Sequence, residues 1–160
     1  MASQSFRRIL ELLDEHGVEH IVVGGVAAVL RGAPVTTFDI DTLVKVDRAN
    51  AERLLAALHA LDARYREHSE VIRPTLEDVL RGGHLLLMTN CGPLDVLGHL
   101  TGEKRYEDVA DRAPALSVGD LSVRVLDLEA LIEEKHALGR PKDRAVAELL
   151  DTVLRNARKR

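Results

Sequence analysis

Two aspartates separated by a single residue, Asp39 and Asp41, form the part of the sequence best suited to chemistry. In a β-strand, side chains at positions i and i+2 point to the same face, so a strand over residues 38–46 would set both carboxylates side by side. Such carboxylates repel each other unless a cation joins them, and Mg²⁺ favours a few carboxylates together with substrate phosphates. The pair alone is a weak signal, because acidic residues with this spacing are also common on exposed strand edges.

A pair of glycines, Gly24 and Gly25, lies between a β-branched segment at 18–23 and an apolar segment at 26–31. Glycine lets the backbone turn sharply and approach a ligand closely. The N-terminus of a following helix offers free N–H groups to a phosphate. A plain strand-to-helix turn is the alternative. The sequence has neither G-x-G-x-x-G nor G-K-[ST], so it favours neither a Rossmann nor a Walker phosphate loop.

A third carboxylate, Asp95, lies in a predicted strand between Leu94 and Val96. A charge among apolar strand residues is costly unless it is paired or bound to metal. Asp95 could therefore complete a metal site, or act as a base toward an acceptor hydroxyl. The alternative is an exposed aspartate at the start of the strand, just past a turn.

Basic residues near the C-terminus could supply charge for a phosphate. Lys135 falls on the apolar stripe of a predicted helix, 128–138, where its ammonium could reach a triphosphate or simply extend to water. Arg140 and Lys142 lie at the start of the next helix and could add positive charge. Asp143, in the first turn of that helix, suits the helix dipole and is expected to be structural.

These residues must be positioned by an α+β fold, in which a mixed β-sheet packs against helices and two helices end the chain. Apolar periodicity and glycine or proline stops predict the elements. Residues 63–73 have no clear assignment. The predicted helices are 5–16, 26–31, 48–62, one from Thr75 to the glycines at 82–83, 106–110, 128–138 and 141–157; the predicted strands are 18–23, 38–46, a hairpin of 84–90 with 94–100, and 121–126.

Composition narrows the class of protein. The 160 residues fit one domain, 1–160, with a core at about 18–126 and a helical part at about 127–157. A net charge of −4 and only four aromatic residues give no reason to expect a long nucleic-acid footprint or a base-stacking platform. The single Cys91 excludes an internal disulfide, which favours a cytoplasmic location, and no apolar run reaches membrane-spanning length. The seven histidines show no H-E-x-x-H pattern.

Two stretches together resemble a known family. The run VVGGVAAVLRGAPVTTFDIDTLV is similar to the Gly-Gly, short helix and D-x-D signature of minimal nucleotidyltransferases of the DNA polymerase β-like superfamily, including abortive-infection and toxin–antitoxin types. The tail LDLEALIEEKHALGRPKDRAVAELL resembles the end of the same proteins. The matching positions are Gly24, Gly25, Asp39, Asp41, Asp95, Lys135, Arg140, Lys142 and Asp143. The chain departs from the family at Val35, where an arginine often stands, and lacks a large C-terminal acceptor domain.

The resemblance implies an enzyme that transfers a nucleoside monophosphate from a nucleoside triphosphate to a hydroxyl of a protein, an RNA or a small molecule. It implies Mg²⁺, or Mn²⁺, held by Asp39, Asp41 and Asp95, with Asp95 also as the base. Gly24, Gly25, Lys135 and Arg140 would bind the triphosphate. A partner protein or a homodimer could complete the acceptor surface. The alternatives are a catalytically inactive member that acts as a nucleotide-binding regulator or toxin–antitoxin partner, and an oligomeric interaction domain whose acidic strand is merely exposed.

Overall fold

A mixed sheet in the order β1-β2-β5-β4-β3 forms the centre of the computed structural model, which describes residues 4–160. Its strands are β1 (His20–Val23), β2 (Ile40–Val44), β3 (Arg64–Tyr65), β4 (His84–Thr89) and β5 (Gly92–Leu97). The central pair, β2 and β5, is parallel, whereas the other neighbours are antiparallel. The parallel register sets residue 41 directly opposite residue 95. The α+β class and the mixed sheet predicted from the sequence are therefore confirmed.

The two faces of the sheet differ in burial, as the strand sequences predict. One face is packed into the apolar core, and its members are Ile40, Leu85, Leu87, Leu94 and Val96. On the opposite face Leu43 is buried, but a neighbouring group of residues is only partly covered or exposed, and these are Asp41, His84, Leu86, Asp95 and Leu97. Because side chains alternate along each strand, Asp41 of β2 and Asp95 of β5 share the open part of this face. A charged cluster on this face does not interrupt the core.

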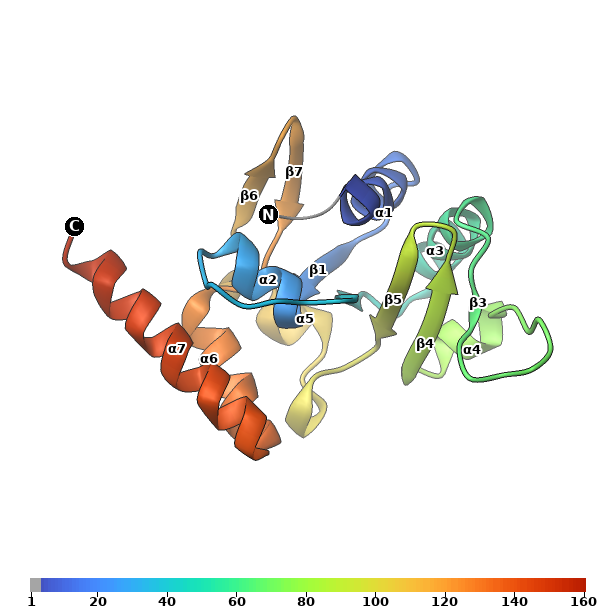
Figure 1. The fold of residues 1–160 in the computed structure, drawn as a ribbon. Helices are drawn as coiled ribbons and strands as arrows, with labels where there is room; N and C mark the ends of the chain where they lie inside the picture. Colours follow the sequence, from blue (N-terminus) through green and yellow to red (C-terminus); the bar gives the residue numbers. More distant parts are fainter. Residues whose placement is uncertain (1–3) are drawn as a thin grey trace.

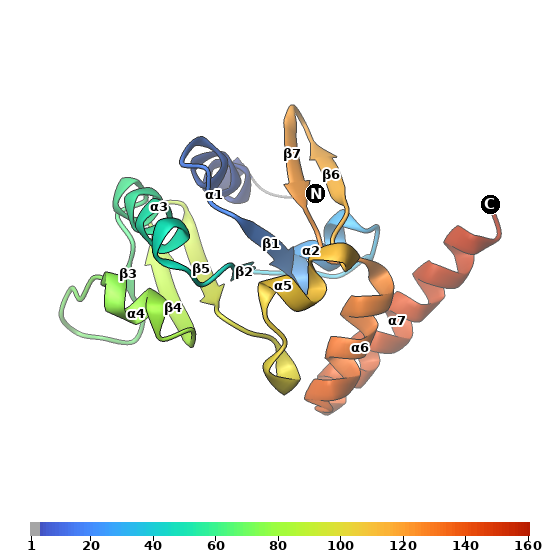
Figure 2. The ribbon, with the colours of Figure 1, turned by 180° about the vertical axis from the view of Figure 1, so that it is seen from behind.

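Helices lie behind and to one side of the sheet and leave the front of β4 and β5 uncovered (Figure 1). The main helices are α1 (Gln4–Glu15), α2 (Gly24–Leu30), α3 (Arg48–Ala60), α6 (Leu128–Leu138) and α7 (Pro141–Arg158). Shorter pieces are α4 (Leu76–Leu80), η1 (Thr101–Glu103), α5 (Tyr106–Val109) and η2 (Ala110–Arg112). Both views show α6 and α7 lying side by side at the end of the chain (Figures 1 and 2). No helix in the described residues is both long and apolar enough to cross a membrane.

The helix ends follow the sequence signals. The predicted pair of Thr75 and Asp78 forms a capping box, in which each side chain binds the backbone N–H of the other. Gly139 ends α6 in the left-handed conformation, and Pro141 begins α7. The predicted helix at 26–31 is wrong at its start, because α2 already begins at Gly24.

The strands hold the larger differences from the sequence prediction. β3 was not predicted, since a strand of two residues has no periodicity to read. The predicted last strand, 121–126, pairs with an unpredicted neighbour in a separate two-stranded sheet of β6 (Ala115–Val118) and β7 (Leu121–Arg124). β6 was missed because it lies in a segment of mixed composition. Just after β7, a parallel bridge between Val22 and Val125 and a 3.0 Å hydrogen bond from the N–H of Leu126 to the carbonyl of Val22 join this hairpin to β1.

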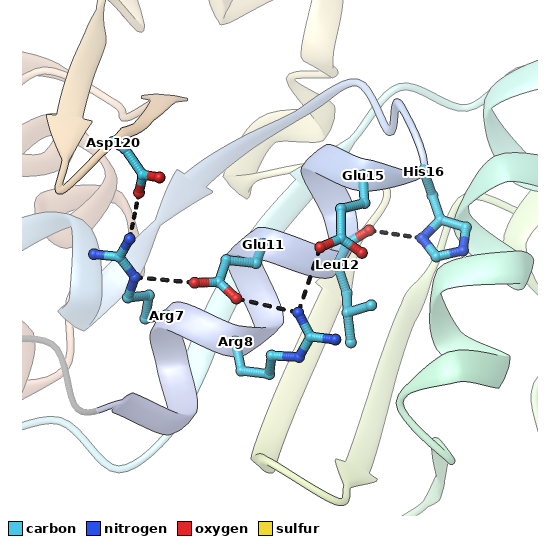
Figure 3. A network of polar contacts seen from close by, with 7 residues as sticks. All are labelled: Arg7, Arg8, Glu11, Leu12, Glu15, His16 and Asp120. Atoms are coloured by element: carbon cyan, nitrogen blue, oxygen red, sulfur yellow. Dashed lines mark hydrogen bonds and ion pairs between the residues drawn. The ribbon is translucent and has the colours of Figure 1, made fainter.

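The basic residues near the N-terminus form ion pairs on α1 and with the β6–β7 turn (Figure 3). Arg7 pairs with Glu11 at 3.0 Å and also with Asp120, in the turn of that hairpin. Arg8 pairs with Glu11 at 3.1 Å and with Glu15 at 3.4 Å. These contacts link α1 to the smaller sheet and account for the charge without a nucleic acid.

A candidate active site around three aspartates

The three predicted carboxylates converge on the open face of the sheet. Asp41 in β2 and Asp95 in β5 are opposite each other in the parallel register, and Asp39 directly precedes β2. One carboxylate oxygen from each residue lies within 4.8 Å of the other two. The spacing of Asp39 and Asp41 and the parallel pairing of β2 with β5 together produce the cluster.

Crowding in the cluster changes the proton affinity of two of its members. Burial, followed by the negative charges of Asp39 and Asp95, raises the pKa of Asp41 to about 8. Burial, followed by the charge of Asp95, also raises the pKa of Asp39. Both shifts have the sign expected of like charges that share a partly dry site. The cluster is therefore short of positive charge.

One positive group does contact the cluster, and the sequence did not reveal it. Arg66 follows β3, and its Nη2 lies 2.7 Å from Oδ1 of Asp95. Its Nη1 donates a hydrogen bond of 2.9 Å to the carbonyl of Leu87 in β4. Arg66 lies within the segment 63–73 that had no predicted structure, and only the β3–β4 pairing brings it to Asp95. No signal in a single sequence would have linked these two residues.

The cluster fits a hard divalent cation. Three carboxylates offer only oxygen ligands, the type that Mg²⁺ and Mn²⁺ prefer. Oδ1 of Asp95 is buried and accepts no hydrogen bond from the described residues, although Arg66 lies close to it. A buried acceptor without a hydrogen bond is rare and calls for an explanation, and an absent ion is a common one. Asp39, Asp41 and Asp95 are thus the residues that could hold a metal.

The two glycines are required by contacts within the chain. A Cβ on Gly24, whose φ is +66°, would lie 2.2 Å from Oδ2 of Asp41. A Cβ on Gly25 would lie 2.6 Å from Oγ1 of Thr37, the hydroxyl that donates a 3.0 Å hydrogen bond to the carbonyl of Asp39. Gly24 makes room for one carboxylate, and Gly25 for the loop that carries another. The signature therefore has a structural reason besides its predicted role toward phosphate.

Lys135 and Arg140 meet at a buried carboxylate beside the cluster. The side chain of Asp143 is only 1% exposed, and it lies 2.5 Å from Nε of Arg140 and 3.5 Å from Nζ of Lys135. These contacts hold the pKa of Asp143 below its usual range, chiefly through the hydrogen bond from Arg140. Asp143 also caps the start of α7, in line with the structural role expected from the sequence. It fixes both cations at the junction of α6 and α7. Leu138, the last residue of α6, is 42% exposed.

Two cavities flank the cluster, and both include Asp41, Asp95, Lys135 and Arg140 in their walls. The first has a volume of about 460 Å³, and its wall is polar; it adds Gly25, Thr37, Asp39, Lys142 and the exposed ring of Phe38. The second has a volume of about 360 Å³, and its wall is richer in apolar groups; it adds Leu86, Leu97, Leu100, Leu131 and Leu138. The carboxylates thus lie between a polar space and an apolar one.

No protein-family description matches the chain, and neither does any curated protein. Several solved structures, however, match the chain in fold. A candidate nucleotidyltransferase, TM1012 from Thermotoga maritima, superposes with a TM-score of 0.60 at 18% identity, over 98% of this chain and 92% of that one. The lincosamide antibiotic adenylyltransferase LnuA, in a lincomycin-bound crystal structure, gives 0.66 at 14% identity, over 96% and 98%. ANT(2″)-Ia, in complex with adenylyl-2″-tobramycin, gives 0.60 at 18% identity, over 96% and 90%.

The likeness extends over nearly the whole chain in each comparison; the first two proteins are described as a nucleotidyltransferase and an adenylyltransferase, and the third holds an adenylylated antibiotic. At these identities the likeness establishes the fold. The chain therefore has a minimal nucleotidyltransferase-like fold: a mixed five-stranded sheet with two helices at its C-terminal end.

Proposed function

We propose that the protein is a nucleotidyltransferase that uses Mg²⁺, or Mn²⁺, to transfer a nucleoside monophosphate from a nucleoside triphosphate to an acceptor hydroxyl. The observation that carries the proposal is the convergence of Asp39, Asp41 and Asp95 within 4.8 Å, beside a cavity lined by basic residues. When bound, the metal would neutralise the triphosphate and stabilise the leaving pyrophosphate. The solved structures of the same fold include two antibiotic adenylyltransferases, which supports this class of reaction.

The polar cavity suits the triphosphate. Lys135, Arg140 and Lys142 line it, and their charges would balance the phosphate oxygens. Lys135 lies 3.5 Å from Asp143, a contact that leaves ammonium hydrogens free for a second acceptor. Gly25 lines the same cavity, and the sequence signature that includes it favours backbone N–H groups as further phosphate ligands there.

The proposed reaction forms one bond and breaks another. Asp95 accepts the proton of the acceptor hydroxyl, whose oxygen bonds to the α-phosphorus of the triphosphate. The bond from that phosphorus to the bridging oxygen breaks, and pyrophosphate leaves. Asp39 and Asp41 would hold the metal. The enzyme would therefore act by positioning the reactants and neutralising their charge.

The apolar cavity favours a small molecule over a protein or an RNA as the acceptor. A volume of about 360 Å³ falls in the range of small-molecule sites. Its apolar wall includes Leu86 and Leu138, two of the few large apolar side chains exposed in the described residues. The one carboxylate of this wall outside the cluster, Glu134, already accepts from the backbone N–H of Thr101. The acceptor we propose is a hydroxyl compound with an apolar face.

A second candidate is a protein that binds nucleotide without transferring it and acts as a regulator or toxin–antitoxin partner. The contact of Arg66 with Asp95 favours this candidate, because a base held by a cation is less available to a hydroxyl. The two candidates differ in products. A transferase releases pyrophosphate in proportion to the modified acceptor, whereas a binding protein gives only a saturable binding signal.

The substitution Asp41→Asn tests the proposed function. We expect transfer to fall by at least about 100-fold, because the removed charge acts directly on the metal and the phosphates. Pyrophosphate release from each of the four triphosphates, with Mg²⁺ and a panel of small alcohols, is the measurement. Asp151→Asn on α7 is the matched control, because it removes an aspartate paired with Arg155 at 3.3 Å, away from both cavities. Undiminished release by Asp41→Asn would rule out this site.

A further inference from the structure

We propose that Arg66 is an internal counter-cation of the carboxylate cluster, and that a divalent cation must compete with it for Oδ1 of Asp95. The inference rests on the proposed metal site. It makes Arg66 a positioning residue that sets the affinity for the metal, rather than a group that touches the substrate.

Arg66 is anchored to β4 at two points, one on its guanidinium and one on its backbone. Its Nη1 donates to the carbonyl of Leu87, so its orientation is fixed against β4. Its backbone N–H donates a 3.0 Å hydrogen bond to the carbonyl of Leu86, the residue opposite Asp95 in the β4–β5 pairing. The side chain of Arg66 is 21% exposed and that of Asp95 is 14% exposed. The pair is therefore built into the sheet and is not a chance surface contact.

The charges explain why a cation is needed here in the absence of metal. Three carboxylates within 4.8 Å of one another repel strongly in a partly buried site. Lys135 forms its ion pair with Asp143 and acts on Asp41 only through its charge, so within the described residues Arg66 is the one cation that forms an ion pair with a member of the cluster. Its positive charge offsets part of the repulsion and keeps Asp95 on the open face.

The contact offsets the charge of Asp95 but leaves its Oδ1 without a hydrogen bond. Arg66 Nη2 lies 2.7 Å from Oδ1, yet that oxygen accepts no aligned hydrogen bond from the described residues. An aligned contact between arginine and a carboxylate would supply one or two hydrogen bonds. The misaligned contact leaves a lone pair of Oδ1 available to a stronger cation. Arg66 can thus hold Asp95 in the metal-free protein and yield it to a divalent ion.

The experiment measures the affinity for Mg²⁺, and separately for Mn²⁺, by calorimetry without nucleotide at low ionic strength. Arg66→Gln removes the charge and keeps a side chain that can still bond to the Leu87 carbonyl. We expect it to bind each ion more tightly by on the order of tenfold, because one repelling charge beside the site is gone. Arg66→Lys keeps the charge and should bind within about twofold of the wild type.

The chain offers a matched control in Arg73→Gln. Arg73 lies 2.6 Å from Asp62 and donates to the carbonyl of Ala63, so it makes the same two kinds of contact away from the cluster. Its loss should leave metal affinity unchanged. Equal or weaker binding by Arg66→Gln, with the fold intact by circular dichroism, would overturn the inference and leave Arg66 a purely structural residue.

The wild type separates this inference from the proposed function. Binding of Mg²⁺ by the wild type that is abolished by Asp41→Asn supports the metal site, whatever Arg66 does. A failure of both the wild type and Arg66→Gln to bind either ion would reject the metal site and the inference together. If the wild type binds the ion but Arg66→Gln does not bind it more tightly, the metal site stands and only the inference about Arg66 is overturned.

Discussion

At the scale of single residues, the site depends on how closely backbone and carboxylates approach. Asp41 lies against Gly24 so tightly that a methyl group on that glycine would overlap its Oδ2. Arg66, in turn, compensates charge at Asp95. The glycine was predicted from its neighbours in the sequence, whereas Arg66 was not, because its partner is distant in the sequence and the two meet only through strand pairing.

The substitution Gly24→Ala should separate backbone strain from the effect on the site. The positive φ of residue 24 costs a non-glycine residue about 1–2 kcal/mol of folding stability. Gly17→Ala is the control, because Gly17 has nearly the same φ, +68°, and its new Cβ would make only an ordinary 3.6 Å contact. We expect both variants to lose about that much folding stability in urea unfolding, and Gly24→Ala to lose more, because its Cβ would also overlap Asp41. Only Gly24→Ala should also lose affinity for Mg²⁺; equal affinities would show that Asp41 adjusts freely.

At the scale of elements, sequence patterns identified most of the helices but left gaps in the sheet. Gly17, Gly139 and Pro141 mark helix ends by local chemistry, which a single sequence contains. The short strands β3 and β6 form because a partner strand is present, so their residues carry little signal of their own. The convergence of Asp41 with Asp95 followed from the family resemblance, and their shared face depends on a register that the sequence does not specify.

A half-buried histidine couples the β1–β2 pair to pH. His20 in β1 lies 2.6 Å from the hydroxyl of Thr42 in β2, through its Nδ1. Burial lowers the pKa of His20 to about 4. In the unfolded chain this pKa is about 6.5, so between these values the unfolded state binds more protons than the folded state. Stability must therefore fall as the pH drops from 6.5 toward 4.

The measurement is urea unfolding at pH 7 and at pH 5. The wild type should lose about 2 kcal/mol through His20 over this interval. His20→Asn keeps a group able to bond to Thr42 but does not titrate, so its loss should be smaller by that amount. The same pH dependence in both proteins would mean that His20 is protonated in the folded state.

At the scale of the whole molecule, the site draws on both halves of the chain. Asp41 and Asp95 come from the sheet and Asp39 from just before β2, and the α6–α7 junction supplies Lys135 and Arg140, which line both cavities together with Asp41 and Asp95. A ligand that spans these parts would stabilise the entire fold. Binding to the folded state alone raises stability in proportion to the logarithm of ligand concentration over Kd.

Thermal unfolding should reveal this linkage. With Mg²⁺ and a nucleoside triphosphate at about 100 times Kd, the free energy of unfolding should rise by about 2.7 kcal/mol, and Tm by about 5–10 °C. Each component alone should give a smaller shift, because the metal and the phosphates complete each other's binding. Strictly additive shifts, or the same shift in Asp41→Asn, would argue against a shared site. Absence of any shift would instead favour an interaction domain with an exposed acidic strand.

The parallel register of β2 and β5 has a mechanical consequence. The chain between these strands runs through α3, β3, α4 and β4 before it returns, so an ion held by Asp41 and Asp95 closes a long covalent loop. Unlike a disulfide, such an ion would leave the unfolded chain free and would stabilise only the folded state, and a chelator would remove it. Pulled apart in a single-molecule force experiment, the sheet should yield at a lower force in EDTA than in Mg²⁺, whereas separation of α6 from α7 should be indifferent to the ion.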